Sequence, residues 1–337
     1  MREEYELEVL EQYDIRVKGT RKIRGAFFCD TEEGMLLLRE TKLSARRASF
    51  LYLVESRLEA GGIIRVDTPV FTKDGELVVT SRDGRTYLLR KWFKGRECDI
   101  RQEDEAACAC ALLARLHREL SALPLSEILS SNPSEAVQSR NPAEVIRSRN
   151  RELKKVRSFI RSRPAKNEFE YLFLESFEQM YHLAEEVLRR MEGDGDAGLF
   201  REGAGEPGLV HGNYNYHNIL ILPDGMAVTG FERLHAGVCA DDLYYFLRKA
   251  MEKYFWKQKT GRRLLEAYET VRPLSAAEKG YVALRLAYPE KYWKTADGYY
   301  RSGKVYLPEK SVEKLRTAVR QREEKRAFLA DVFSCYI

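Results

Sequence analysis

The chain has 337 residues, of which 44% are hydrophobic and 32% charged, a composition typical of a globular protein and not of a disordered or fibrous one. This length predicts one large domain or two unequal ones. The net charge of +5 is too small to indicate nucleic-acid binding, and no apolar run is long enough to span a membrane. Six scattered cysteines without a Cys-x-x-Cys pair favour reduced thiols and synthesis in the cytoplasm.

The first 94 residues show strand patterns, in which short apolar runs are separated by turn residues. A helix over residues 1–13 precedes them, and a second helix over 45–60 ends at a Gly-Gly pair. The basic segment 18–25 is predicted to be a loop, either facing phosphates or forming a solvated hairpin. Strands are predicted near residues 13–17, 26–30, 35–39, 77–80 and 86–93. Five strands with one helix after the third predict a strand-rich N-terminal lobe over 1–94.

Helical periodicity dominates residues 95–337, which we predict to form a helical C-terminal lobe. His117 lies on an apolar helix face, where a packing role is favoured over metal binding. Acids at the start of a later helix, Asp241 and Asp242, either cap that helix or hold the loop before it. Helices are predicted over residues 106–120, 169–191, 240–249, 262–270, 276–288, 292–300 and 311–333.

Residues 140–166 form a cationic segment with ten Lys or Arg and two Glu, a local charge of +8 against −3 for the remainder. A solvated helix face is the simpler interpretation. The alternative is a docking surface for an anionic partner. Because aromatic residues are not interleaved with the cations, the segment does not indicate single-stranded nucleic-acid binding.

Residues 210–232 read as loop, strand, turn and strand, beginning with His211-Gly-Asn213 and ending near Gly230-Phe-Glu232. This order resembles the catalytic and metal-binding loops of kinase-like phosphotransferases. The resemblance implies that Asn213 stands at the place of the catalytic base and Gly230 at the place of a metal-binding Asp. His211 and Asn218 match the family, with Asn218 at the position of a metal ligand.

These substitutions bear directly on phosphoryl transfer. The reaction needs an Asp to orient the attacking hydroxyl and carboxylates to hold Mg²⁺ against the phosphates of ATP. An Asn amide is not a usable base, and Gly offers Mg²⁺ no ligand. Taken alone, the same residues would also fit a loop in which His211 packs and Asn218 caps a turn.

A third departure lies at Arg39, which ends the strand where kinase-like enzymes carry a phosphate-binding Lys. Arg keeps the charge but not the compact geometry of an ammonium. Glu55 on the following helix is the predicted partner of Arg39, while pairing with a neighbouring Arg is the alternative. Arg39 and Glu55 are therefore the nucleotide-binding candidates that the resemblance supplies.

Matched segments over almost the whole chain resemble the spore coat protein S (CotS) family, which is related to aminoglycoside phosphotransferases. The segments that carry this resemblance are residues 34–39, 92–95, 113–117, 211–219, 242–249 and 288–300. The resemblance implies an α+β, bilobal, protein-kinase-like fold whose small lobe has antiparallel strands plus one helix. It also implies synthesis in the mother-cell cytoplasm and a place in the spore coat.

Together these features predict a spore-coat pseudokinase with a structural or interaction role, because the two Asp positions are Asn213 and Gly230. Its partners would be other coat proteins, with neither a membrane nor a specific nucleic acid. The alternative is a weakly active phosphotransferase that uses ATP and Mg²⁺ on a small hydroxylated or amino-sugar-like substrate. In that case Asp224 or Glu232 would replace the missing metal ligand.

Overall fold

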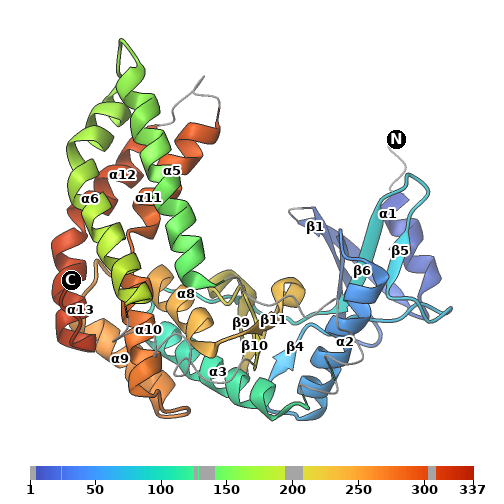
Figure 1. Cartoon of the computed structure of the whole chain (residues 1–337). Helices are drawn as coiled ribbons and strands as arrows, with labels where there is room; N and C mark the ends of the chain where they lie inside the picture. Colours follow the sequence, from blue (N-terminus) through green and yellow to red (C-terminus); the bar gives the residue numbers. More distant parts are fainter. Residues whose placement is uncertain (1–4, 24, 125–127, 129–140, 194–207, 303–308) are drawn as a thin grey trace. The chain divides into compact units, whose positions relative to one another are not determined.

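The structure is a computed structural model that describes all residues except 1–4, 24, 125–127, 129–140, 194–207 and 303–308 (Figure 1). The chain forms two compact units. Unit 1 contains residues 1–137 and 208–237, and unit 2 contains residues 138–207 and 238–337. These units are defined by compactness, so the predicted lobe boundary between residues 94 and 95 stays a prediction.

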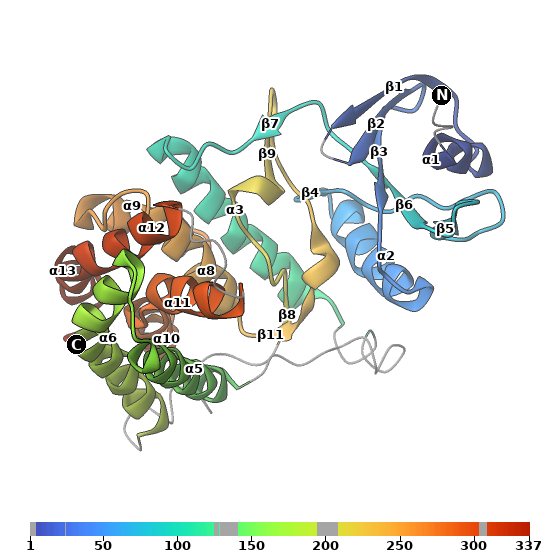
Figure 2. The ribbon, with the colours of Figure 1, turned by 90° about the horizontal axis from the view of Figure 1, so that it is seen from above.

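Unit 1 is built on a five-stranded antiparallel sheet in the order β1-β2-β3-β6-β5, whose first three strands lie side by side in Figure 2. Helix α2 lies after the third strand, as the sequence predicts. The strands are β1 (Val17–Ile23), β2 (Ala26–Thr31), β3 (Met35–Glu40), β5 (Val78–Thr80) and β6 (Thr86–Lys91).

The two faces of this sheet have separate apolar cores, because side chains alternate along each strand. On one face Leu36, Leu38 and Leu89 pack against Val9 and Leu10. These last two belong to η1 (Val9–Gln12), which follows the short helix α1 (Tyr5–Glu8). In place of the single helix predicted over 1–13, the described residues form two short helical turns, α1 and η1. Residues 1–4 of the predicted helix lie outside the described part.

Helix α2 (Ala45–Ala60) covers the other face, where Ala48 packs with Leu77 and Leu88. Its bounds are those predicted from the sequence. The helix begins at Ser44, whose side chain accepts a hydrogen bond from the Arg47 N–H at 3.1 Å. Such a cap satisfies one of the four N–H groups that lack partners at a helix start.

The basic segment 18–25 is mostly strand and not loop, so this prediction was wrong. β1 occupies Val17–Ile23 at the sheet edge, and all seven of its residues are exposed. Its alternating side chains therefore bury no apolar face, and burial is the source of a strand's usual sequence signal. Lys and Arg on such an edge also oppose unwanted strand pairing.

A second sheet of unit 1 has the order β4-β10-β9-β7, with β4 parallel to β10 and the other pairs antiparallel. The β9–β10 hairpin is the strand, turn, strand pattern predicted within residues 210–232. A short pair, β8 and β11, flanks it. The remaining elements of unit 1 are α3 (Glu103–Ala122), β4 (Arg65–Val66), β7 (Arg96–Glu97), β8 (Gly208–Val210), η2 (Tyr216–Asn218), β9 (Ile219–Leu222), β10 (Gly225–Val228), η3 (Phe231–Arg233) and β11 (His235–Gly237).

The described part of unit 2 is helical, as predicted, and its core is rich in aromatic side chains such as Phe173, Phe177 and Tyr292. The helix predicted over 311–333 is interrupted at Gln321, which separates α12 from α13. The helices are α5 (Pro142–Ser162), α6 (Glu168–Glu192), α8 (Cys239–Met251), α9 (Gln258–Glu269), α10 (Ala276–Ala287), α11 (Glu290–Arg301), α12 (Glu309–Arg320) and α13 (Arg322–Phe333). Across the described ranges of both units, every helix is too short or too polar to cross a membrane.

Candidate functional site

The loop between β8 and η2 is held by His211, which is fully buried. The Asn213 N–H donates to His211 Nδ1 at 3.2 Å, so Nδ1 is an acceptor and the proton lies on Nε2. Nε2 then donates to the Thr229 carbonyl at 3.0 Å. A neutral imidazole therefore ties the loop that carries Asn213 to the segment that carries Gly230. Tyr214 fixes the same loop to α3 by donating to the Ala109 carbonyl at 2.8 Å.

Asn213 and Asn218 are brought together, as the spacing predicts, but their polar atoms are used within the loop. Asn218 Nδ2 donates to the Asn213 carbonyl at 3.0 Å. Asn215 Nδ2 donates to the same carbonyl at 2.8 Å and to Asn213 Oδ1 at 3.2 Å. The Asn213 side-chain oxygen thus accepts a hydrogen bond from Asn215 of the same loop. Because this side chain is an amide and not a carboxylate, it is not a usable base for a substrate hydroxyl.

Gly230 has a left-handed backbone with φ of +79°, which disfavours most side chains. A Cβ atom at this position would lie 2.9 Å from Asn218 Cγ and from Asn218 Oδ1. An Asp could not be placed here without displacing Asn218. Gly230 is therefore packed directly against the side chain of Asn218, which leaves no room for a carboxylate at this position.

A carboxylate from another segment lies beside Gly230. Asp67 follows β4, which pairs in parallel with β10 and so brings Asp67 next to the residues after β10. The Gly230 N–H donates to Asp67 Oδ1 at 3.2 Å and Oδ2 at 3.3 Å. Asp67 is 2% exposed, and its burial raises the pKa of the carboxyl to about 7, opposed by the nearby Arg90 guanidinium.

Glu55 is fully buried on α2, and its charged partner is Arg90 of β6. Arg90 Nη1 donates to Glu55 Oε2 at 2.9 Å and to the Asp67 carbonyl at 2.9 Å. Arg90 Nη2 lies 3.8 Å from Glu232 Oε1. Burial raises the pKa of Glu55, and Arg90 opposes that rise. One guanidinium therefore faces three carboxylates, which we call the Arg90 cluster: Glu55, Asp67, Arg90 and Glu232.

The predicted pairing of Arg39 with Glu55 is wrong, because register places a different cation beside Glu55. In the β3–β6 ladder Arg39 lies opposite Leu88, whereas Leu37 lies opposite Arg90. Arg39 and Arg90 share a sheet face, but their levels differ by two residues, or about 7 Å along the strand. Arg39 is exposed and precedes α2, whereas Glu55 lies about three helical turns into that helix.

The two acids suggested as replacement metal ligands differ in position. Asp224 lies in the turn at the opposite end of the β9–β10 hairpin from Gly230. It makes a bidentate pair with Arg65 at 2.6 and 2.7 Å, so its proposed metal role is wrong. Glu232 lies near Arg90, but in the short helix η3 and not on the strand that we expected. Within the described ranges no group of three or more His, Cys, Asp or Glu is arranged to hold a metal ion.

Sequence reasoning missed Arg90 and Asp67, although one signal was present. Arg90 follows the apolar run Tyr87-Leu-Leu of a buried strand. A charge at such a position requires a buried partner of opposite sign. The signal identified a paired Arg but not its partners, since Asp67 reaches the cluster only through the parallel pairing of β4 with β10.

The cationic segment 140–166 largely coincides with α5, and residue 140 lies outside the described part. Four of its arginines have carboxylate partners within unit 2, including Arg149 with Glu290 at 2.5 Å and Arg163 with Glu170 at 3.1 Å. Arg147 and Arg157 pair with Glu192 and Glu178. Much of the segment's charge is therefore neutralised locally, and its role as a docking surface stays a prediction.

The fold is that of the aminoglycoside phosphotransferases, as the resemblance predicted. The crystal structure of an aminoglycoside phosphotransferase from Alicyclobacillus acidocaldarius subsp. acidocaldarius DSM 446 is similar, with a TM-score of 0.82 and 18% identity over 97% of this chain and 94% of that one. The AMP-bound complex of spectinomycin phosphotransferase APH(9)-Ia has a TM-score of 0.64 and 12% identity, covering 94% of this chain and 96% of that one.

A third similar structure is amicoumacin kinase hAmiN in complex with AMP-PNP, Ca²⁺ and Ami. It has a TM-score of 0.60 and 14% identity, covering 95% of this chain and 92% of that one. At these identities the likeness establishes the fold alone. The fold is therefore kinase-like and of the aminoglycoside phosphotransferase type.

Within that class the chain belongs to the family described as "Spore coat putative kinase YutH", whose model matches residues 6–332. This confirms the resemblance to spore coat kinase-like proteins. No curated protein sequence matches the chain significantly.

Proposed function

We propose that this protein is a spore-coat pseudokinase, a kinase-like scaffold with a structural or interaction role and coat proteins as partners. The observation that carries the proposal is the packing at Gly230, where the side chain of Asn218 lies against the place of the missing carboxylate. Asn213 at the base position supports it further. Two groups that phosphoryl transfer requires are thus replaced, and at one of these positions, Gly230, Asn218 occupies the space that a side chain would need.

The Arg90 cluster supports the same conclusion. In a kinase-like site a cation beside the helix Glu is shared with the nucleotide phosphates. Here Arg90 donates to Glu55 and lies 3.7 Å from Asp67 and 3.8 Å from Glu232, so carboxylates of the protein offset its charge, although its Nη2 makes no hydrogen bond among the described residues. We infer that ATP gains little from this guanidinium.

Calorimetric titration with ATP, in the presence and absence of Mg²⁺, tests the proposal. We expect no enhancement of ATP binding by Mg²⁺ and no transfer of the γ-phosphate. Asn218→Ala removes the remaining matched metal ligand. Asn215→Ala is its matched control, because it removes another hydrogen bond to the Asn213 carbonyl without touching Gly230. Mg²⁺-enhanced binding that is lost in Asn218→Ala but kept in Asn215→Ala would contradict the pseudokinase assignment.

A second candidate function is weak ATP-dependent phosphotransfer to a small hydroxylated or amino-sugar-like substrate. One observation favours it, namely the Asp67 carboxylate hydrogen-bonded to the Gly230 N–H. Asp67 with Asn218 would then hold Mg²⁺ against ATP. Transfer that persists in a highly purified sample and disappears in both Asp67→Asn and Asn213→Ala would establish this function in place of the first.

The coat location that we propose rests on the family to which the chain belongs. A tagged full-length chain should be recovered in the coat extract of purified spores. Recovery from the spore core alone would contradict this location. Binding to purified coat proteins would then identify the partners directly.

A further inference from the structure

A groove in unit 2 gathers cations from three helices, α8, α11 and α12. Its volume is about 540 Å³, within the range of about 300–1,000 Å³ that is usual for small-molecule sites. We call it the lysine groove. Its lining residues that matter here are Arg248, Lys249, Glu252, Lys291, Lys294 and Lys314.

The lysine groove contains five cations and one carboxylate. Glu252 is paired with Arg248 at 2.7 Å, and outside the lining Glu290 is paired with Lys294 at 3.2 Å. The remaining three lysines have no carboxylate within ion-pair distance among the described residues. These three are Lys249, Lys291 and Lys314. The groove therefore has an excess of positive charge that the protein itself does not neutralise.

Electrostatic crowding is visible at two of these lysines. Burial lowers the pKa of Lys249, and the adjacent Arg248 lowers it further. Burial also lowers the pKa of Lys291, with Lys253, Lys314 and Arg248 adding to the effect while Glu252 opposes it. Like charges at close range raise the free energy of the folded state. An anion in the groove would remove this cost.

One residue that lines the groove, Arg248, also has an unsatisfied donor. The Arg248 side chain is 5% exposed, and its Nε has no hydrogen-bond partner among the residues that the structure describes. Its Nη1 donates to Glu252, so the guanidinium is held in place while one buried N–H remains available. Leaving a buried donor unpaired is unfavourable, and such groups are normally matched by a partner.

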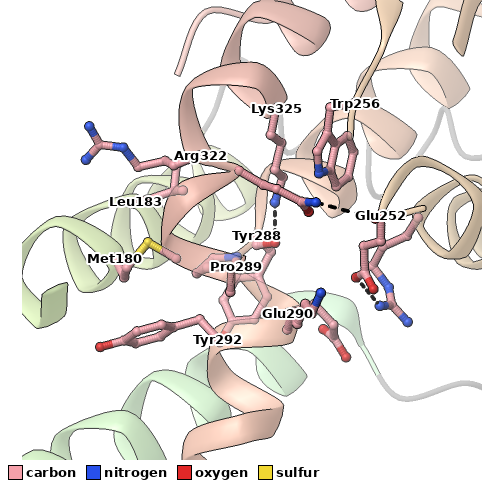
Figure 3. A pocket seen from close by; sticks show the side chains of 14 residues that line it. Met180, Leu183, Glu252, Trp256, Tyr288, Pro289, Glu290, Tyr292, Arg322 and Lys325 are labelled. Carbon is pink, nitrogen blue, oxygen red and sulfur yellow. Dashed lines mark hydrogen bonds and ion pairs between the residues drawn. The ribbon is translucent and has the colours of Figure 1, made fainter. Parts of the chain in front are cut away.

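An adjoining pocket, shown in Figure 3, shares Arg248, Glu252 and Lys291 with the groove. There Lys325 lies over the Trp256 ring and donates to the Tyr288 carbonyl at 2.8 Å and the Ala287 carbonyl at 2.9 Å. These carbonyls end α10, where a cation is favourable. Lys325 therefore has a structural explanation, whereas Lys249, Lys291 and Lys314 have no carboxylate partner among the described residues.

We propose that the lysine groove binds a compact ligand carrying two or more phosphate groups. Lysine ammonium groups act as point charges for phosphate, and several of them around one volume fit a ligand with several phosphates. Arg248, which Glu252 holds in place, would donate a further hydrogen bond to the ligand. This site lies in α8, α11 and α12, and not in the cationic segment 140–166 or among the residues aligned with kinase catalysis.

Calorimetric titration of the full chain with inorganic tripolyphosphate at low ionic strength tests the proposal. We expect saturable binding that Lys249→Gln combined with Lys291→Gln weakens by about tenfold or more, which corresponds to about 1.4 kcal/mol. Arg151→Gln combined with Lys155→Gln is the matched control, because it removes two exposed cations from α5. That control should change the affinity by less than about twofold, allowing for general electrostatic screening.

Equal weakening by both double variants would overturn the proposal, since binding would then follow net charge alone. Absence of binding to the unaltered chain would overturn it as well. Tighter binding of citrate than of tripolyphosphate would overturn the phosphate assignment. The probe carries no nucleoside, and Asn218→Ala should leave its binding unchanged. A failure of this site is therefore distinguishable from a failure of the proposed pseudokinase function.

Discussion

The Arg90 cluster of unit 1 and the lysine groove of unit 2 have opposite ratios of cations to carboxylates. In the cluster one buried guanidinium is shared among carboxylates that surround it. In the groove five cations share one lining carboxylate and are partly open to solvent. Internal pairing indicates a structural role in the first region, whereas unneutralised charge indicates a binding role in the second. The buried cation of unit 1 is thus surrounded by carboxylates of the protein, although Arg90 Nη2 and Glu55 Oε1 have no hydrogen-bond partner among the described residues.

Arg90→Met should have the largest effect on stability, because it leaves Glu55 and Asp67 buried without their cation. Removing one partner of a buried ion pair costs about 3–5 kcal/mol. Urea unfolding measures the change in the free energy of unfolding. Arg65→Met is the control, since its pair with Asp224 is exposed and should contribute less than about 1 kcal/mol. Similar small losses in both variants would show that the cluster is not a structural centre.

Gly230→Asp tests whether a carboxylate can be introduced at the position where the family resemblance implies a metal ligand. We expect a loss of about 1–3 kcal/mol from backbone strain and from contact with Asn218, without Mg²⁺-dependent transfer. Gly84→Asp is a matched control, because Gly84 has a φ of +81° but no atom within 4 Å of an added Cβ. Thermal unfolding should show a larger loss at Gly230, partly recovered when Asn218→Ala is added. Equal losses of stability in Gly230→Asp and Gly84→Asp would show that contact with Asn218 does not restrict the side chain at position 230.

The stability of unit 1 should depend on pH through Asp67, whose pKa is raised to about 7 in the folded chain from an ordinary value near 4. Between these values the folded state binds more protons than the unfolded state, so stability falls as pH rises from about 4 to 7. Asp67→Asn should flatten this dependence by about 1 kcal/mol or more. The measurement is the free energy of unfolding at several pH values. A slope equal to that of the unaltered chain would contradict the prediction.

The smallest expected effect is a gain in stability from relieving the lysine groove. Lys249→Gln with Lys291→Gln should raise the free energy of unfolding by a few tenths of a kcal/mol at low salt, about the size of exposed charge effects. The gain should shrink at high salt, where exposed charges are screened. Chemical denaturation without added phosphate compounds measures it. A loss of stability at both salt concentrations would mean that these lysines are needed for packing.

Local sequence patterns were sufficient to predict some helices and strands but not others. Helix 45–60 was predicted to the residue, because its apolar periodicity and the Gly-Gly pair that follows it are local features of the sequence. The hairpin after Asn218 was equally clear from its apolar runs and turn. The first strand was predicted near residues 13–17 but occupies Val17–Ile23, because an exposed edge strand lacks alternation of buried and exposed residues.

The sequence by itself determined most of the order of elements and, through its resemblance to the family, the kinase-like fold. It also placed Asn213 and Gly230 where that resemblance implies carboxylates, since these features depend on residue identity and spacing. Only the tertiary structure decided that Glu55 pairs with Arg90 and not with Arg39, and that Asp67 lies beside Gly230. It also decided that Asn218 fills the space next to Gly230. Strand register and parallel pairing set these contacts between segments far apart in the chain, where local patterns of side chains carry no information.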